Sequence, residues 1–93
     1  MTDVQTSLLK FEFARALEEL GADESMLNAA IEKGLDVFKE IFSIKIQQLV
    51  LDHIHPDRSL HYFYMQNPGL VNEIINNSTE IFLEIYAKKS REN

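Results

Sequence analysis

The sequence contains no cysteine. Neither a disulfide bond nor a zinc ion bound by thiolates can therefore supplement the hydrophobic core. The 93 residues suffice for one domain, and a domain of this size buries only a modest core. We expect a single helical domain over residues 1–93, for which oligomerisation is the remaining common source of additional buried area.

The chain also lacks a block of basic residues. It carries 9 lysines and arginines against 15 aspartates and glutamates, a formal net charge of −6. Nucleic-acid binding needs clustered basic side chains, and the one such cluster, Lys88, Lys89 and Arg91, suits the negative end of a helix dipole. We therefore expect no nucleic-acid binding, and an acidic surface that suits a basic protein partner.

Long apolar runs are absent as well. No run approaches the roughly 20 residues that span a bilayer, and the N-terminus has no apolar segment typical of a signal peptide. Together with the lack of cysteine, this predicts a cytoplasmic protein without membrane contact.

Helical periodicity dominates the remainder and predicts an all-α fold of four helices with short connections. The first helix is expected from Asp3 to about Leu20, with Thr2 or Asp3 as N-cap and Gly21 in a left-handed conformation after its end. Its predicted buried face consists of Leu9, Phe13, Leu17 and Leu20, widened by Val4, Leu8 and Phe11.

The second predicted helix is unusually long, from a cap at Asp23 to about Ile54. It is apolar over more than half its circumference, so it must be covered on two sides. A second subunit could supply part of that cover, which predicts a dimeric helical bundle with two-fold symmetry. The residues expected in subunit contacts are Leu35, Phe38, Phe42, Ile46 and Leu49.

Gly34 lies inside this long helix, where glycine costs about 1 kcal/mol relative to alanine. We expect the close approach of another helix as compensation. A break near Ser43, which would split the segment in two, is the alternative.

Pro56 is expected to end the long helix, because proline disfavours helical backbone at His55. Asp57 or Ser59 then caps a short third helix that extends to about Gln66. The last helix is expected from Pro68, at its first position after a cap at Asn67, to about Lys89.

The segment from Asp52 to Tyr64 is the first candidate for a functional surface, because it holds all three histidines and two of the three tyrosines. Tyrosine combines a large apolar body with a polar tip and is enriched at interfaces. The residues expected to bind a partner are His53, His55, Asp57, His61, Tyr62 and Tyr64.

The histidines also raise the alternative of a metal-binding protein. On one helix, however, His53 and His55 would point about 200° apart, and only irregular backbone near Pro56 could bring them together. We therefore expect neither a metal nor another cofactor.

A second alternative comes from His55-Pro56-Asp57, which resembles the loop signature of J-domains, the co-chaperone modules that stimulate Hsp70 ATPases. The resemblance implies that these three residues join two antiparallel helices and contact the chaperone. The family's preceding helix is basic, whereas here Lys45 is the only nearby lysine.

Catalysis has little support in the sequence. No cysteine nucleophile is present, the serines lie in no recognisable motif, and Asp57 and His61 have the spacing of an ordinary surface pair. We therefore expect a non-enzymatic interaction module, a small regulator, adaptor or inhibitor that binds another protein. An inhibitor that competes with phosphates for a basic groove would use the acidic surface.

Overall fold

The computed structural model describes residues 4–22 and 24–92. For residues 24, 27, 29–31 and 86–92 it describes the backbone alone. Thr2, Asp3 and Asp23, the predicted caps of the first two helices, lie outside the described residues. The helices are α1 (Val4–Gly21), α2 (Glu24–Lys33), α3 (Leu35–Ile54), α4 (Arg58–Gln66) and α5 (Pro68–Glu92). No strand occurs in the described residues, so the predicted all-α class is confirmed.

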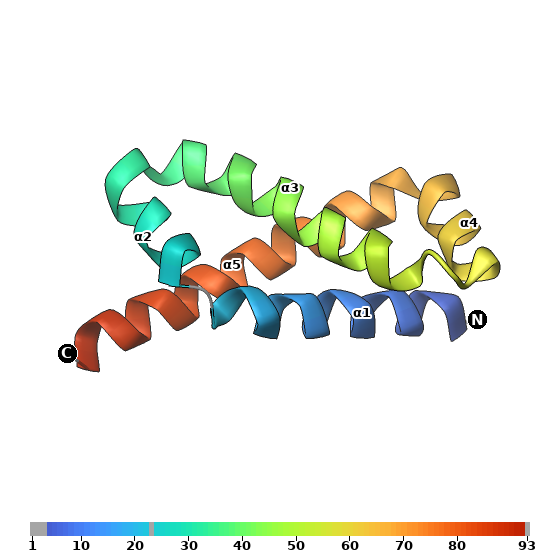
Figure 1. Cartoon of the computed structure of the whole chain (residues 1–93), viewed down its shortest axis with the longest axis horizontal. Helices are drawn as coiled ribbons and strands as arrows, with labels where there is room; N and C mark the ends of the chain where they lie inside the picture. Colours follow the sequence, from blue (N-terminus) through green and yellow to red (C-terminus); the bar gives the residue numbers. More distant parts are fainter. Residues whose placement is uncertain (1–3, 23, 93) are drawn as a thin grey trace.

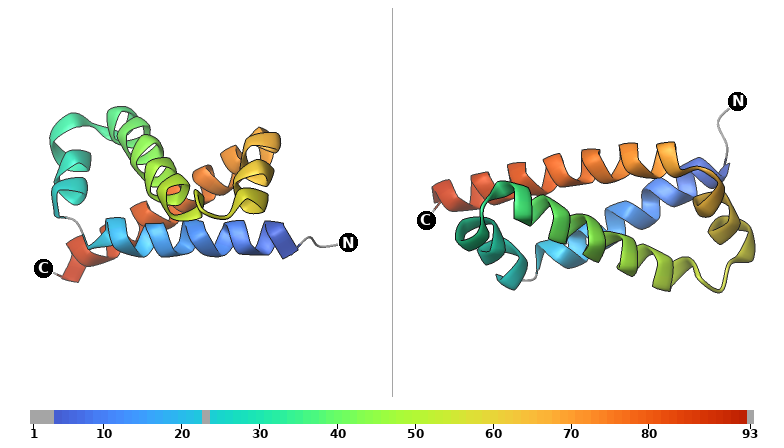
Figure 2. Two further views of the ribbon diagram at one scale, coloured as in Figure 1. Left: turned by 45° about the vertical axis from the view of Figure 1, so that its right-hand side comes forward. Right: turned by 90° about the horizontal axis from the view of Figure 1, so that it is seen from above.

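The three long helices, α1, α3 and α5, form the body of the molecule (Figure 1). The short helices lie at opposite ends, where α2 carries the chain from α1 to α3 and α4 carries it from α3 to α5 (Figures 1 and 2). The result is an elongated bundle of 42 × 22 × 21 Å. Among the described helices, none is long and apolar enough to cross a membrane.

One continuous hydrophobic core joins all five helices. At one place it is aromatic, since the rings of Phe38, Phe42 and Phe82 lie with centroids 5.0–5.7 Å apart. The core consists of Leu9, Phe13, Ala16, Leu20, Met26, Phe38, Phe42, Ile46, Val50, Ile54, Leu60, Tyr64, Val71, Ile74, Ile75 and Phe82.

The buried face of α1 is narrower than predicted. Leu9, Phe13 and Leu20 are buried as expected, and Ala16 completes the buried face. The predicted widening of this face is wrong, because three further apolar side chains of α1 face solvent. These residues are Val4, Leu8 and Phe11, which we call the α1 stripe.

The second predicted helix is divided at Gly34 into α2 and α3, and not near Ser43. Gly34 has φ 86° and ψ 162°, a region essentially restricted to glycine. The predicted close approach of another helix is wrong, because a Cβ atom at Gly34 would meet nothing within 4 Å. Gly34 is therefore needed for its backbone conformation. The turn lets α2 pack against α3, where Ser25 and Lys45 line the same pocket.

This packing bears on the predicted subunit contacts. The single chain already buries three of these residues completely, since Phe38, Phe42 and Ile46 are each 0% exposed. They therefore cannot contact a second subunit in this conformation. Leu49 is half-buried, and Leu35, at 50% exposure, is the one clearly exposed member of the set. The chain covers this line of α3 with its own helices, whereas Val37 and Ile44 of α3 are exposed. Homodimerisation stays a prediction.

The chain turns near Pro56, as the sequence predicted, but the physical cause differs from the predicted one. Helix α3 ends at Ile54, yet His55 keeps helical dihedrals (φ −48°, ψ −42°), so the expected avoidance of that region is wrong. Pro56 has no N–H to donate to the carbonyl of Asp52, and the ladder of hydrogen bonds stops there. Instead, the Asp57 N–H donates to the Ile54 carbonyl at 2.8 Å.

Asp57 is confirmed as the cap of α4, since its Oδ1 accepts a hydrogen bond from the Leu60 N–H at 3.1 Å. Pro68 is confirmed as the first residue of α5. Gly21, by contrast, is the last residue of α1, and Gly34 is the one described residue with positive φ, so a left-handed Gly21 is not observed.

Candidate interaction surface on α4

Helix α4 divides cleanly into a buried and an exposed side. Leu60 and Tyr64 face the core, whereas Arg58, Tyr62 and Met65 project outward at the i, i+4 and i+7 positions of one helical face. Tyr62 is 67% exposed and Met65 is 58% exposed. Together with two histidines at their flank, described next, they form the α4 surface, which consists of His55, Arg58, His61, Tyr62 and Met65.

The turn at Pro56 brings His55 and His61 together. Their ring centroids lie 6.2 Å apart, with an interplanar angle of 73°. His55 is exposed and His61 is half-buried. Irregular backbone near Pro56 thus pairs two histidines, as the sequence allowed, but the pair is His55 with His61 and not with His53.

His53 is not part of this pair and links α3 to α1. Its Nδ1 lies 2.7 Å from Oε1 of Glu12, which also accepts from Nε of Arg15 at 3.3 Å. Arg15 in turn reaches Oε2 of Glu19 at 3.5 Å. Of the predicted partner-binding residues, His53 is therefore engaged in a bond between helices.

Tyr64 belongs to the core and not to the surface. Its ring is nearly parallel to that of Phe13, with centroids 6.3 Å apart, and its hydroxyl donates to Oε1 of Gln47 at 3.1 Å. Nε2 of Gln47 donates to the Ser43 carbonyl at 3.2 Å. Burial raises the pKa of Tyr64 above its ordinary value of 10.0. Tyr64 therefore cannot contact a partner directly in this conformation, although the sequence predicted such a contact.

Asp57 is exposed, but one of its carboxylate oxygens is used as the cap of α4. Its role at the α4 surface is thus to hold the helix in place. Sequence reasoning missed Arg58 and Met65. Their spacing from Tyr62 was the available signal, because residues at i−4 and i+3 share its face on any helix.

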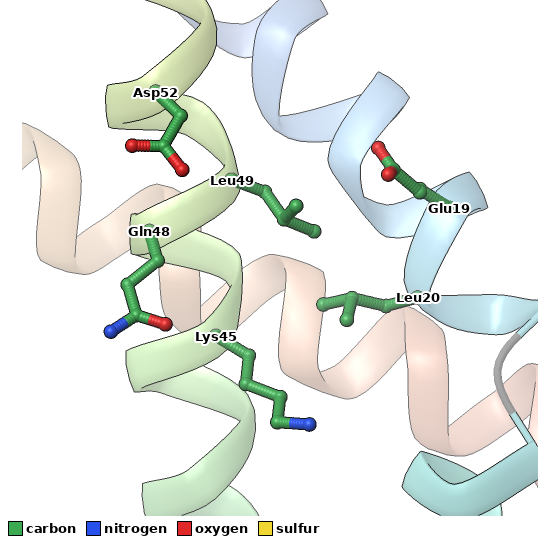
Figure 3. Close-up of a pocket in the computed structure, with 6 residues that line it drawn as sticks. All are labelled: Glu19, Leu20, Lys45, Gln48, Leu49 and Asp52. Atoms are coloured by element: carbon green, nitrogen blue, oxygen red, sulfur yellow. The ribbon is translucent and has the colours of Figure 1, made fainter.

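A separate groove of about 310 Å³ lies between α1 and α3. Leu20 and Leu49 point toward each other across it, and the side chain of Lys45 extends from α3 toward α1 beside them (Figure 3). Glu19, Gln48 and Asp52 complete the lining. The volume is at the lower end of small-ligand cavities, and charges of both signs at the rim give the groove no clear charge preference.

Within the described part of the chain, no three His, Cys, Asp or Glu side chains are grouped so that they could hold a metal ion. Comparison with known protein families, with curated proteins and with solved structures found no match.

Proposed function

We propose that this chain is a non-enzymatic protein-interaction module, a small cytoplasmic regulator, adaptor or inhibitor that binds another protein through the α4 surface. The observation that carries the proposal is the exposure of Tyr62 and Met65 beside Arg58 on one helical face. Tyrosine, methionine and arginine are enriched in the cores of protein interfaces, and tyrosine and arginine are frequent hot spots.

Helix α4, which carries most of the α4 surface, is anchored to the rest of the fold. Leu60 and Tyr64 anchor α4 in the core, and Asp57 caps its first turn. A preorganised surface loses less conformational freedom on binding, so more of the contact energy remains as affinity.

The charge of the chain favours a partner with a basic surface. The net charge is −6, and Glu73, Glu80 and Glu84 are all exposed on α5. Such a field accelerates encounter with a basic protein and competes with phosphates for a basic groove. In this proposal, charge guides the encounter and the α4 surface provides the close contacts. Binding is then expected to weaken as salt is raised.

The test is site-specific photo-crosslinking followed by affinity measurement. A photoreactive residue in place of Tyr62 should capture a partner, and the same residue in place of Ile44, an exposed apolar residue on α3, should not. The affinity of the captured protein is then measured for Arg58→Ala, Tyr62→Ala and the control Ile44→Ala. We expect a loss of more than about 1 kcal/mol for the first two variants. Equal affinities for all three variants would contradict the proposal.

The homodimer is retained as part of the proposal, but with other contacts. Leu35 and the α1 stripe remain exposed, whereas Phe38, Phe42 and Ile46 do not. Light scattering over a range of concentrations gives the mass directly. A dimer that Phe11→Glu dissociates would place the contact on α1, and a mass of 10.8 kDa at every concentration would exclude the dimer.

The J-domain-like alternative is favoured by one observation. His55 and Asp57 are exposed in the turn that joins α3 and α4. If the resemblance extends to function, the protein should stimulate an Hsp70 ATPase and His55→Gln should abolish the stimulation. An ATPase rate that the protein leaves unchanged would remove this alternative.

A further inference from the structure

We infer that His55 and His61 form a binding site for a divalent transition-metal ion of the zinc type, with water in the remaining coordination positions. This inference does not depend on the proposed partner. Imidazole is the commonest protein ligand for such ions, and it suits zinc, copper and nickel.

The geometry is close to that of two histidines on one ion. Zinc lies about 2.0 Å from each imidazole nitrogen, so tetrahedral ligation holds two ring centroids about 5 Å apart. The observed separation of 6.2 Å exceeds this by a distance that side-chain rotation can remove. His55 is exposed, while half-buried His61 provides the more fixed ligand.

Neighbouring groups limit the number of protein ligands and the charge that the site can offer a metal ion. The described residues offer no third ligand in a ready-made set, and Oδ1 of Asp57 is already used as the helix cap. The positive charge of Arg58, next in the chain, opposes a cation. The site therefore supplies two protein ligands and leaves the ion open to water, which distinguishes it from a closed structural zinc site.

The third histidine provides a matched control. His53 is exposed, as His55 is, but its Nδ1 bonds to Glu12 of α1. A metal that binds any surface histidine would not distinguish His53 from His55 and His61. A metal that needs two adjacent imidazoles would.

The experiment is calorimetric titration of the whole chain with zinc chloride at pH 7.5, for the wild type and for His53→Gln, His55→Gln and His61→Gln. We expect binding to the wild type and to His53→Gln, and a loss of at least about tenfold in affinity for each of the other two. Circular dichroism verifies that each variant is folded.

A second measurement keeps the inference testable if a variant unfolds. In the wild type, the imidazole NMR signals of His55 and His61 should shift together on addition of zinc and return on addition of a chelator, while those of His53 should not move. The inference is overturned by an absence of zinc binding, by equal effects of all three substitutions, or by zinc shifts at His53 alone.

Discussion

The chain turns at both ends of α3, and the two turns have different physical causes. At the N-terminal end, Gly34 adopts a backbone conformation that residues with side chains rarely adopt. At the C-terminal end, Pro56 interrupts the helical hydrogen bonds and Asp57 caps the next helix. One turn depends on the freedom of a single residue, and the other on hydrogen bonds lost and gained. The two should therefore respond differently to substitution.

The largest loss of stability is expected from a substitution in the core, which the Gly34 turn lets a single chain form. Phe42 is 0% exposed and touches the rings of Phe38 and Phe82. Phe42→Ala should lower the free energy of unfolding by about 3–5 kcal/mol, whereas Leu35→Ala, at an exposed position, should stay within about 0.5 kcal/mol. Urea denaturation measures both. A Phe42→Ala variant of unchanged stability but halved mass would show that Phe42 belongs to a subunit contact instead.

The next largest loss of stability is expected from a substitution at Gly34 itself. Gly34→Ala forces a side chain into the glycine-restricted region and should cost about 1–3 kcal/mol, although no atom lies near the new methyl group. Gly21 is a matched control, because it also has free space around it but lies in α1 with ordinary helical backbone. Gly21→Ala should stabilise by up to about 1 kcal/mol. If both substitutions stabilise the fold, the chain does not turn at Gly34.

At the other end of α3, the cap of α4 is expected to matter less. Asp57→Ala removes the acceptor for the Leu60 N–H and should cost about 1 kcal/mol. Asp57→Asn keeps an acceptor oxygen and should cost little, because asparagine caps helices about as well as aspartate. A large loss in the asparagine variant would mean that the charge, and not the cap, holds the turn.

The smallest effect concerns Tyr64, which anchors α4 next to the second turn. Tyr64→Phe leaves Oε1 of half-buried Gln47 without its donor and should cost about 0.5 kcal/mol at neutral pH. Burial raises the pKa of Tyr64 in the folded chain above 10.0, so above that pH the unfolded chain releases a proton that the folded chain retains. Stability should therefore fall as the pH rises above about 10, less so in Tyr64→Phe. Equal pH dependence would exclude this role of Tyr64.

These differences explain which parts of the fold the sequence could predict. Asp57, Pro56 and Pro68 act through hydrogen bonds that a residue type makes or cannot make, so their positions mark helix ends directly. The Gly34 turn was missed because the apolar pattern continues through Phe38 and Phe42 on either interpretation. A glycine inside such a pattern does not reveal the sign of its φ angle.

The candidate surface shows the same limit. The sequence favoured the segment from Asp52 to Tyr64, but it could not separate Tyr62, which is exposed, from Tyr64, which is buried. That distinction depends on where α1 and α3 lie around α4. The pairing of His55 with His61 likewise depends on the path of the chain around Pro56.

The central claim is that the chain turns at Gly34, so that α2 and the long helices bury Phe38, Phe42 and Ile46 of α3 within one molecule. The most direct test is the distance between spin labels on Ser25→Cys and Lys45→Cys, which is simple to prepare because the chain has no native cysteine. Both positions line one pocket between α2 and α3, so a distance well below 30 Å is expected. A continuous helix would separate them by about 30 Å, and that result would contradict the account.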